Sequence, residues 1–435
     1  MIRHKLGFFF SFLWVALLSA TVVPNTDAQQ WPQWRGEDSR NHSSESGLFE
    51  NWNDSGPKKL WTATGLGSGY ATVSIADGKI FTSGNTETSQ QVTARDLEGK
   101  ELWSTSITDE VPKHSYLGSR TTPTWSDGKI YVVGSNGNIC CLDAEDGDEI
   151  WCRDFDDWGG RMMSSWGYSE SPMVDGDHVI CTPGGPKGMV VALDRKTGEE
   201  VWACKLPEYG DEEYGVNGKS LMDGAGYSSI VKTEGGGVKQ YVQLVGRGLI
   251  GIRASDGKLL WRYMKVANGT ANIPTPIIDG DHIFTSTSYN TGAALLKLVP
   301  GDDDGVDVEE VYWLKSKTFQ NKLGGMTLVD GHIYCGHGNG SGYPVCLEML
   351  SGEVKWGPLR SKGKGESSLI YADGHLVWRR QNGLVILTKV NSQSMEVVGS
   401  FMPDYQEGNS WAQPVIADGV MYLREQDKLM AYQLK

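Results

Sequence analysis

The stretch "CLDAEDGDEIW", Cys141 to Trp151, has the form that decides the fold. An apolar strand-like run leads into an acidic turn that contains glycine, and a second run ends in tryptophan. A polar turn with glycine between two apolar runs is typical of a β-hairpin. The same phrase returns as "DLEGKELW", "DRKTGEEVW", "ASDGKLLW" and "EMLSGEVKW", ending at Trp103, Trp202, Trp261 and Trp356.

A second phrase, an apolar run, Asp-Gly and another apolar run, comes before each copy of the first. A stretched copy of the tryptophan phrase ends at Trp313, and "NSQSMEVVGSF" has lost the tryptophan. Eight units at intervals of about 43 to 60 residues, each a four-stranded antiparallel meander, predict an all-β, eight-bladed β-propeller. The Asp-Gly phrases start at Ile75, Trp125, Met173, Ile277, Leu328, Tyr371 and Ile416, and a weaker copy, "VKTEGGGVKQYV", starts at Val231.

The two ends of the repeat region complement each other. The last repeat ends at "DKLMAYQLK" without a tryptophan strand, whereas "GPKKLW", Gly56 to Trp61, precedes the first Asp-Gly phrase. We expect this amino-terminal strand to complete the last blade and close the ring, which removes two exposed strand edges. The propeller should therefore span residues 56–435, with residues 29–55 as an arm. Within the arm, "WPQWRGEDSRN" should pack on the propeller through its two tryptophans, with ligand binding as the alternative.

Residues 1–28 have the features of a secretory signal peptide. Basic residues precede a 13-residue apolar run, Leu6 to Leu18, and Thr26-Asp27-Ala28 forms a cleavage site. The run is too short to span a membrane. No cysteine precedes Cys140, so no lipid-attachment cysteine follows the signal. We expect a periplasmic or secreted protein that is neither membrane-spanning nor lipidated.

Net charge and motif content exclude several function classes. The formal charge of −14 should repel nucleic acid and anionic lipid surfaces. The sequence contains no G-x-S-x-G elbow, no H-E-x-x-H motif, no phosphate-binding P-loop and no haem-attaching C-x-x-C-H. The acidic segment "GDDDGVD", Gly301 to Asp307, lacks the spacing of a calcium loop and is predicted to be an exposed turn. No metal site is predicted.

The phrases "ALDRKTGEEVW" and "CLDAEDGDEIW" resemble the tryptophan-docking repeat of the pyrroloquinoline-quinone (PQQ)-like propellers. The resemblance covers residues 56–435 and implies the propeller fold. It implies two different functions, because quinoprotein dehydrogenases and the BamB-like scaffold of outer-membrane protein assembly share this repeat. A shared fold does not decide between them, so the site has to be argued separately.

Candidate site residues come from the loops that lead into the innermost strands, around the central funnel. Aligning these loops on the Asp-Gly phrase brings aromatic and charged residues to similar positions, and such a ring could bind a ligand or a partner. Packed channel plugs are the alternative. The candidate ligand or partner residues are Tyr70, Trp166, Tyr227 and Trp411, and the candidate cofactor-binding residues are Arg120, Glu170, Asn272, Lys322 and Glu366.

The cofactor implied by the dehydrogenase resemblance makes specific demands. PQQ carries three carboxylates, which call for several cations, and its calcium ion calls for oxygen ligands. The funnel loops offer two nearby cations, and the oxygen candidates come from three separated blades without a motif. We therefore favour a binding or assembly scaffold of the cell envelope, with a protein partner or small ligand at the funnel. The alternatives are a PQQ-dependent alcohol or sugar dehydrogenase, with PQQ and calcium as cofactors, and a carbohydrate-binding protein.

The seven cysteines raise the question of disulfide bonds. Cys140 and Cys141 are neighbours in a predicted strand, so their side chains should point to opposite faces and no bond should join them. We expect both to be free thiols. Cys335 and Cys346 flank a predicted hairpin and are the candidate disulfide pair.

Overall fold

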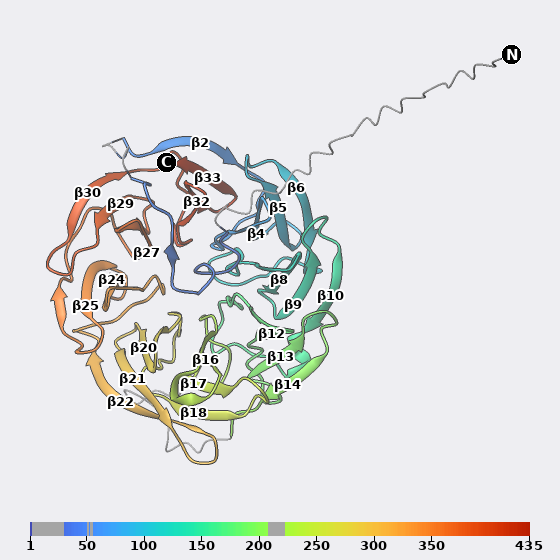
Figure 1. Ribbon diagram of the computed structural model, residues 1–435, viewed down its shortest axis with the longest axis vertical. Helices are drawn as coiled ribbons and strands as arrows, with labels where there is room; N and C mark the ends of the chain where they lie inside the picture. Colours follow the sequence, from blue (N-terminus) through green and yellow to red (C-terminus); the bar gives the residue numbers. More distant parts are fainter. Residues whose placement is uncertain (2–29, 50–51, 53–54, 208–221) are drawn as a thin grey trace.

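The computed structural model describes Met1 and residues 30–49, 52, 55–207 and 222–435. Eight sheets surround a central axis, and each contains the four strands of one blade (Figure 1). The predicted eight-bladed β-propeller is thus confirmed, including the weak copy at Val231. Residues 2–28 of the predicted signal peptide lie outside the described residues.

Blades one to four follow the chain from the inner strand of each sheet to its outer strand. Blade one holds β3 (Ser74–Ala76), β4 (Lys79–Asn85), β5 (Gln90–Asp96) and β6 (Glu101–Ser106). Blade two holds β7 (Thr124–Ser126), β8 (Lys129–Gly134), β9 (Asn138–Asp143) and β10 (Glu149–Asp154). Blade three holds β11 (Met173–Asp175), β12 (His178–Cys181), β13 (Val190–Asp194) and β14 (Glu200–Cys204). Blade four holds β15 (Val231–Thr233), β16 (Gln240–Val245), β17 (Gly248–Arg253) and β18 (Leu259–Tyr263).

Blades five to eight continue in the same order around the ring. Blade five holds β19 (Ile277–Asp279), β20 (His282–Thr287), β21 (Gly292–Pro300) and β22 (Val306–Lys315). Blade six holds β23 (Thr327–Val329), β24 (His332–His337), β25 (Tyr343–Glu348) and β26 (Val354–Trp356). Blade seven holds β27 (Ser367–Ala372), β28 (His375–Arg380), β29 (Val385–Lys389) and β30 (Glu396–Phe401). Blade eight holds β31 (Val415–Ala417), β32 (Val420–Glu425), β33 (Lys428–Gln433) and, from the other end of the chain, β2 (Lys58–Ala63).

Helical structure is slight in the described part of the chain. Two short 3₁₀ helices, Phe155–Trp158 and Gly235–Gly237, interrupt the loops. None of the helices that the structure describes has the length and apolar character needed to cross a lipid bilayer.

The Asp-Gly phrase makes the tight turn between the two inner strands of a blade. In blade one, Asp77 and Gly78 have φ angles of 48° and 70°. Positive φ at both central residues is the signature of the turn that matches the twist of a two-residue hairpin. Because strands alternate in direction, these turns lie on one face of the ring, and the loops entering the inner strands lie on the other.

The tryptophan phrase joins neighbouring blades. The Trp103 indole donates a hydrogen bond to the Ala144 carbonyl at 3.2 Å, and its ring packs on Gly147 in the turn of the next blade. A Cβ atom at Gly147 would lie 2.6 Å from the Trp103 ring, so the ring requires glycine there. Trp151 repeats this arrangement on Gly198, with a hydrogen bond to the next blade. The glycine of each such repeat therefore contacts the tryptophan of the preceding blade, and its tryptophan contacts the glycine of the next blade.

Blade five corrects one assignment of the repeat. Its outer strand has the usual bulge, and the residue that directly follows the bulge is Tyr312, which lies opposite Leu295. The Tyr312 ring packs on Gly352 of blade six, and its hydroxyl donates to the Met349 carbonyl at 2.5 Å. Tyr312 thus takes the docking position that the sequence assigned to Trp313. Trp103 and Trp151 follow the same bulge directly, whereas Trp313 lies one residue beyond that position, which the tryptophan pattern could not reveal.

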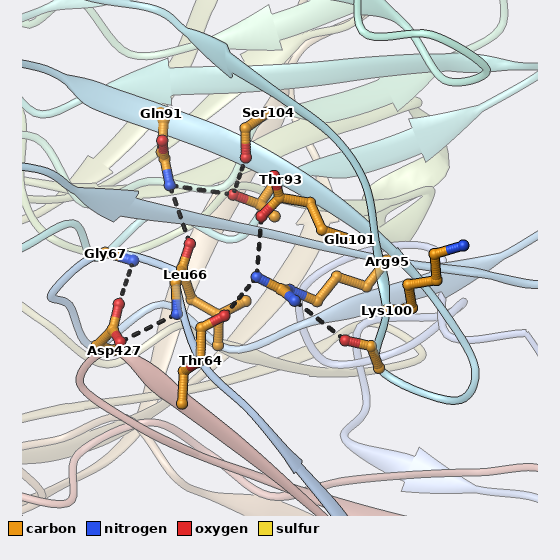
Figure 2. Close-up of polar contacts among 12 residues, drawn as sticks. Thr64, Leu66, Gly67, Gln91, Thr93, Arg95, Lys100, Glu101, Ser104 and Asp427 are labelled. Atoms are coloured by element: carbon orange, nitrogen blue, oxygen red, sulfur yellow. Dashed lines mark hydrogen bonds and ion pairs between the residues drawn. The ribbon is translucent and has the colours of Figure 1, made fainter.

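Ring closure is as predicted. Strand β2 pairs antiparallel with β33, with Trp61 opposite Ala431, so the amino-terminal strand completes the last blade. The link from β2 to blade one is also held by side chains (Figure 2). The Asp427 carboxylate accepts hydrogen bonds from the Gly65 and Gly67 amides at 3.0 and 2.9 Å. Arg95 donates to the Thr64 carbonyl at 2.6 Å.

The arm crosses the central channel rather than lying on the outside of the ring. Trp31, 1% exposed, exchanges two backbone hydrogen bonds of 2.8 Å with Ile75 of blade one. Arg35 donates to the Met326 carbonyl of blade six at 2.8 Å. Strand β1 (His42–Ser43) pairs in parallel with β27 of blade seven. Figure 1 shows the arm, in dark blue, passing through the middle of the ring.

The cysteines are paired differently from the prediction. Cys140 and Cys141 are not joined to each other, but Cys140 forms a disulfide with Cys152, and Cys141 is free. The bulge in β10 shifts the register so that Cys152 lies directly opposite Cys140. The predicted pair was also wrong, because Cys335 and Cys346 are buried free thiols. Cys335 lies opposite Val345 and Cys346 opposite Tyr334, so the two sulfurs belong to opposite faces of the hairpin.

Candidate functional site

A cavity of about 390 Å³ opens at the axis, on the face formed by the loops that enter the inner strands. We call it the funnel cavity. It brings together six of the nine predicted site residues, drawn from blades one, two, three, four, six and eight. These six are Tyr70, Arg120, Trp166, Tyr227, Lys322 and Trp411.

The walls of the funnel cavity are mainly aromatic. The Trp411 ring lies 5.0 Å from the Tyr70 ring and 5.1 Å from the Tyr116 ring, measured between centroids. Across the cavity, the Trp166 and Tyr227 rings are 5.9 Å apart. Such distances are those of edge-to-face and tilted aromatic pairs, which fix the rings in place. The Tyr227 hydroxyl is held by Ser164 at 2.7 Å, and burial raises the pKa of Tyr227.

Arg120 is tied to its own loop. Its guanidinium donates to the carbonyls of Ser115, Tyr116 and Gly118 at 2.9, 2.7 and 3.2 Å. It also lies over the Tyr70 ring, 5.7 Å from the centroid. Burial lowers the pKa of Arg120. An arginine keeps its charge under such a shift, so Arg120 carries a fixed positive charge into the cavity wall.

Lys322 is the second cation of the cavity. Its ammonium lies 5.5 Å from the Tyr289 centroid and 3.8 Å from a Glu366 oxygen. Glu366 is 2% exposed and does not line the cavity, but accepts a hydrogen bond from the Gly340 amide. Burial raises the pKa of Glu366 to about 7. Glu366, which was predicted to bind the cofactor, is therefore a buried carboxyl that pairs with Lys322.

Two other predicted residues, Glu170 and Asn272, lie inside the blades. The Glu170 carboxylate accepts hydrogen bonds from the Thr182 amide and hydroxyl at 2.7 and 2.9 Å, and from Gln243 at 3.1 Å. Burial raises the pKa of Glu170 to about 8. The Asn272 amide donates to the carbonyls of Val245 and Gly246. Both side chains connect the inner ends of neighbouring strands and do not reach the cavity.

Three aromatic residues of the cavity were missed by the sequence alignment. Trp34 comes from the arm, Tyr116 from an early part of the loop before blade two, and Tyr289 from the turn between β20 and β21. None of them occupies the repeat position that was aligned. Tyr116 and Tyr289 have φ angles of 57° and 58°. Bulky residues rarely adopt this left-handed conformation, and such strain often accompanies functional sites.

Trp34 separates the funnel cavity from space below it. A small gap lined by Gln33, Trp34 and Thr124 lies beneath the funnel, and a second cavity of about 380 Å³ opens on the Asp-Gly face. Gln33 and Thr124 line that second cavity as well. The arm therefore divides the axial channel, and its second tryptophan, Trp34, forms the inner end of the funnel cavity in addition to attaching the arm.

The residues of the funnel cavity do not provide the groups that PQQ and calcium would need. The described lining holds two cations, Arg120 and Lys322, for the three carboxylates of PQQ, and Lys322 already faces the Glu366 carboxylate. The oxygen atoms of Glu170 and Asn272 are turned into the blades and are already hydrogen-bonded. Calcium requires six to eight oxygen ligands around one point, and the described residues do not present them there.

One other group of metal-binding side chains gathers among the described residues. Cys140, Glu149 and Cys152 lie close enough to share an ion. The disulfide between Cys140 and Cys152 removes two of the three ligands. Cysteine binds a metal as the thiolate, which a disulfide does not provide, so this group is structural.

Comparison with solved structures agrees with the fold. The crystal structure of BamB from Moraxella catarrhalis superimposes with a TM-score of 0.58 at 13% sequence identity. The match covers 87% of this chain and 97% of that chain. At this identity the likeness shows a shared architecture.

Curated relatives match at the level of sequence. The outer membrane protein assembly factor BamB of Alteromonas naphthalenivorans is 29% identical over 113 residues, which are 24% of this chain and 26% of that protein. Quinohemoprotein alcohol dehydrogenase ADH IIB of Pseudomonas putida is 26% identical over 240 residues, 44% of this chain and 33% of that protein. The matches thus span about a quarter to a third of these relatives' own length.

A family model extends the match over more of the chain. The model described as outer membrane protein assembly factor BamB covers residues 88–358, more than half of the 435 residues. The matched region starts in blade one and ends after blade six. With the repeat, the eight blades and the docking contacts described above, this match shows that the chain belongs to the BamB family of PQQ-like repeat propellers.

Proposed function

We propose that this protein is a scaffold of the cell envelope that holds a protein partner on its funnel face. The observation that carries the proposal is the convergence of seven aromatic side chains and two cations at the mouth of the axis. Concave aromatic sites with a few placed polar groups are typical binding sites. The kinship with BamB, an outer membrane protein assembly factor by name, supports a role in assembly.

The rim of the funnel cavity favours a macromolecular partner. Tyr116, which lines the cavity, and Leu117, its neighbour in the chain, are 54% and 64% exposed. Exposed apolar residues beside a cavity mark places where a partner covers surface. A ligand of the cavity's own size would leave Leu117 in water. A protein segment would cover both the cavity and its rim.

The dehydrogenase alternative has less support. The relationship to ADH IIB supports it, but the residues of the funnel cavity do not provide the cations and oxygen ligands that the cofactors need. The carbohydrate alternative is supported by the three tryptophans that line the cavity, Trp34, Trp166 and Trp411. No observation of the described residues favours it over a protein partner.

Site-specific photo-cross-linking in the cells of origin tests the scaffold. A photoreactive residue at position 117 should give a discrete protein adduct, because Leu117 lies on the proposed contact face. The matched control is position 100, because Lys100 is exposed on the turn between β5 and β6 (Figure 2) and is not part of the funnel lining. The absence of any protein adduct at 117, or equal adducts at both positions, would contradict the scaffold.

A further inference from the structure

The charged residues that line the funnel cavity are all cations. Arg120 and Lys322 are part of the lining, and no aspartate or glutamate is among the described residues that form it. This is unusual for a chain whose net charge is −14. A low-dielectric concave wall strengthens the local field of such charges. The cavity is therefore a positive site within an acidic protein.

Both cations are held by the walls. Arg120 lies over the Tyr70 ring, and Lys322 lies near the face of the Tyr289 ring. Among the described residues, Arg120 forms no ion pair with a carboxylate, and the carboxylate nearest to Lys322 is 3.8 Å away and almost fully buried. Each cation is thus positioned in advance and retains donor capacity for an acceptor in the cavity.

Three hydroxyl groups of the cavity lining can also donate to an acceptor. The hydroxyl oxygens of Ser171, Ser229 and Thr275 each accept a hydrogen bond from a backbone amide, which leaves the O–H of each able to donate. Around these donors, the aromatic walls offer apolar surface to a ring. An occupant that satisfies both features carries a carboxylate close to an aromatic group.

We propose that the funnel cavity binds a polypeptide segment in which an acidic side chain lies next to an aromatic one. The aromatic ring enters between Trp166 and Trp411, and the carboxylate meets Arg120 or Lys322. The exposed Tyr116 and Leu117 on the rim contact the flanking residues of the segment. This inference rests on the proposed scaffold function and gives its partner a chemistry.

Nucleic acid is a poorer candidate, although it also combines anions with aromatic rings. A strand places a phosphate at every nucleotide, so most of its charges would lie outside the cavity and face an acidic surface. A short peptide with one or two carboxylates avoids that repulsion. The two occupants can be separated by direct titration.

Isothermal titration calorimetry with the full-length mature protein and unlabelled ten-residue peptides tests the inference. One peptide combines glutamate and phenylalanine, a second replaces each glutamate with lysine, and a third replaces each phenylalanine with alanine. We expect the first to bind at least about tenfold more tightly than the other two, because each partial match loses charge-assisted or aromatic contacts. A single-stranded thymidine decanucleotide serves as the fourth ligand and should bind more weakly than the first peptide.

Three variants locate the binding in the cavity. Lys322→Gln and Arg120→Gln should each weaken binding of the acidic aromatic peptide roughly five- to tenfold. Because Arg120 also holds its loop, Arg120→Lys, which keeps the charge, is the partner variant and should retain more of the affinity than Arg120→Gln. Lys100→Gln removes an exposed cation far from the cavity and should bind like the wild type. Melting temperatures of all variants verify that they are folded.

The possible outcomes separate this inference from the scaffold function. Equal binding of the acidic and basic peptides, tighter binding of the oligonucleotide, or no peptide binding would overturn the acidic aromatic partner. Loss of affinity in Lys100→Gln equal to that in Lys322→Gln would overturn it as well. In each case the scaffold function still holds if position 117 cross-links to a protein. If no adduct forms, both the acidic aromatic partner and the scaffold function are wrong.

Discussion

Glu170 shows how one residue of a funnel loop serves the fold. Its carboxylate bridges blade three and blade four through Thr182 and Gln243, and it is 3% exposed. Burial disfavours the charged form and raises the pKa of Glu170 to about 8, although the hydroxyl and amide of Thr182 offset part of this effect. Among the described residues, no cation forms an ion pair with Glu170. Glu170 is therefore a buried carboxyl that joins two blades and does not bind a ligand in the cavity.

Glu170 should make the stability of the protein depend on pH. A carboxyl whose folded pKa lies above its unfolded value binds more protons in the folded state. Its contribution is therefore complete below about pH 4.5 and is lost as the pH rises through about 8. We expect the free energy of unfolding to fall by roughly 2–4 kcal/mol over this window on account of Glu170.

Melting curves between pH 5 and pH 8.5 measure this effect. The variant Glu170→Gln cannot ionise, so its melting temperature should change less over the same window. Glu366, with a pKa of about 7, contributes with the same sign, and Glu366→Gln is the matched variant at the second buried carboxyl. Parallel pH profiles for the wild type and Glu170→Gln would show that Glu170 is ionised throughout.

At the scale of elements, the amino-terminal segment has two separable tasks. Strand β2 covers the open edge of β33, and the arm before it crosses the channel with Trp31 and Arg35 buried. An uncovered strand edge invites pairing with another chain. The two tasks can be tested by two truncations that differ by five residues.

Truncation should separate the arm from the closing strand. A chain that begins at Pro57 keeps β2 and loses the arm, so we expect a folded ring with a lower melting temperature. A chain that begins at Thr62 also loses the half-buried Trp61 and most of β2, which leaves the edge of β33 open. We expect that chain to aggregate, as measured by light scattering during thermal melting. Identical melting and scattering of the two chains would rule out closure by β2.

At the scale of the whole molecule, the ring presents two different faces. The funnel face collects aromatic residues and cations from separate blades, and the opposite face carries the Asp-Gly turns. The arm keeps the two cavities apart. A propeller of this kind is suited to binding on one face, and its chemistry depends on which groups the loops turn toward the axis.

Added PQQ and calcium should not produce a dehydrogenase. The cations of the funnel are Arg120 and Lys322, and the candidate oxygen ligands Glu170 and Asn272 are hydrogen-bonded inside the blades. We expect no dye-linked oxidation of alcohols or sugars, with a quinohemoprotein alcohol dehydrogenase as the positive control of the assay. Micromolar PQQ binding that disappears in Arg120→Ala would contradict this and favour the dehydrogenase.

The sequence by itself determined the repeat, the number of blades and the closure of the ring. These features depend on local contacts that recur at each interface, such as Trp103 on Gly147, so each copy of the phrase carries its own evidence. The phase of the repeat also located Tyr70, Arg120, Tyr227 and Trp411 at the axis. Positions in a regular ring follow from the period.

Only the tertiary structure decided which side chains of the same loops face the cavity. Glu170 and Asn272 turn into the blades because buried donors there require an acceptor or a bridge, and no pattern in the chain specifies that choice. Trp34 reaches the funnel from outside the repeat. The bulge in β10 places Cys152 opposite Cys140, because one extra residue in a strand shifts the register of every residue beyond it.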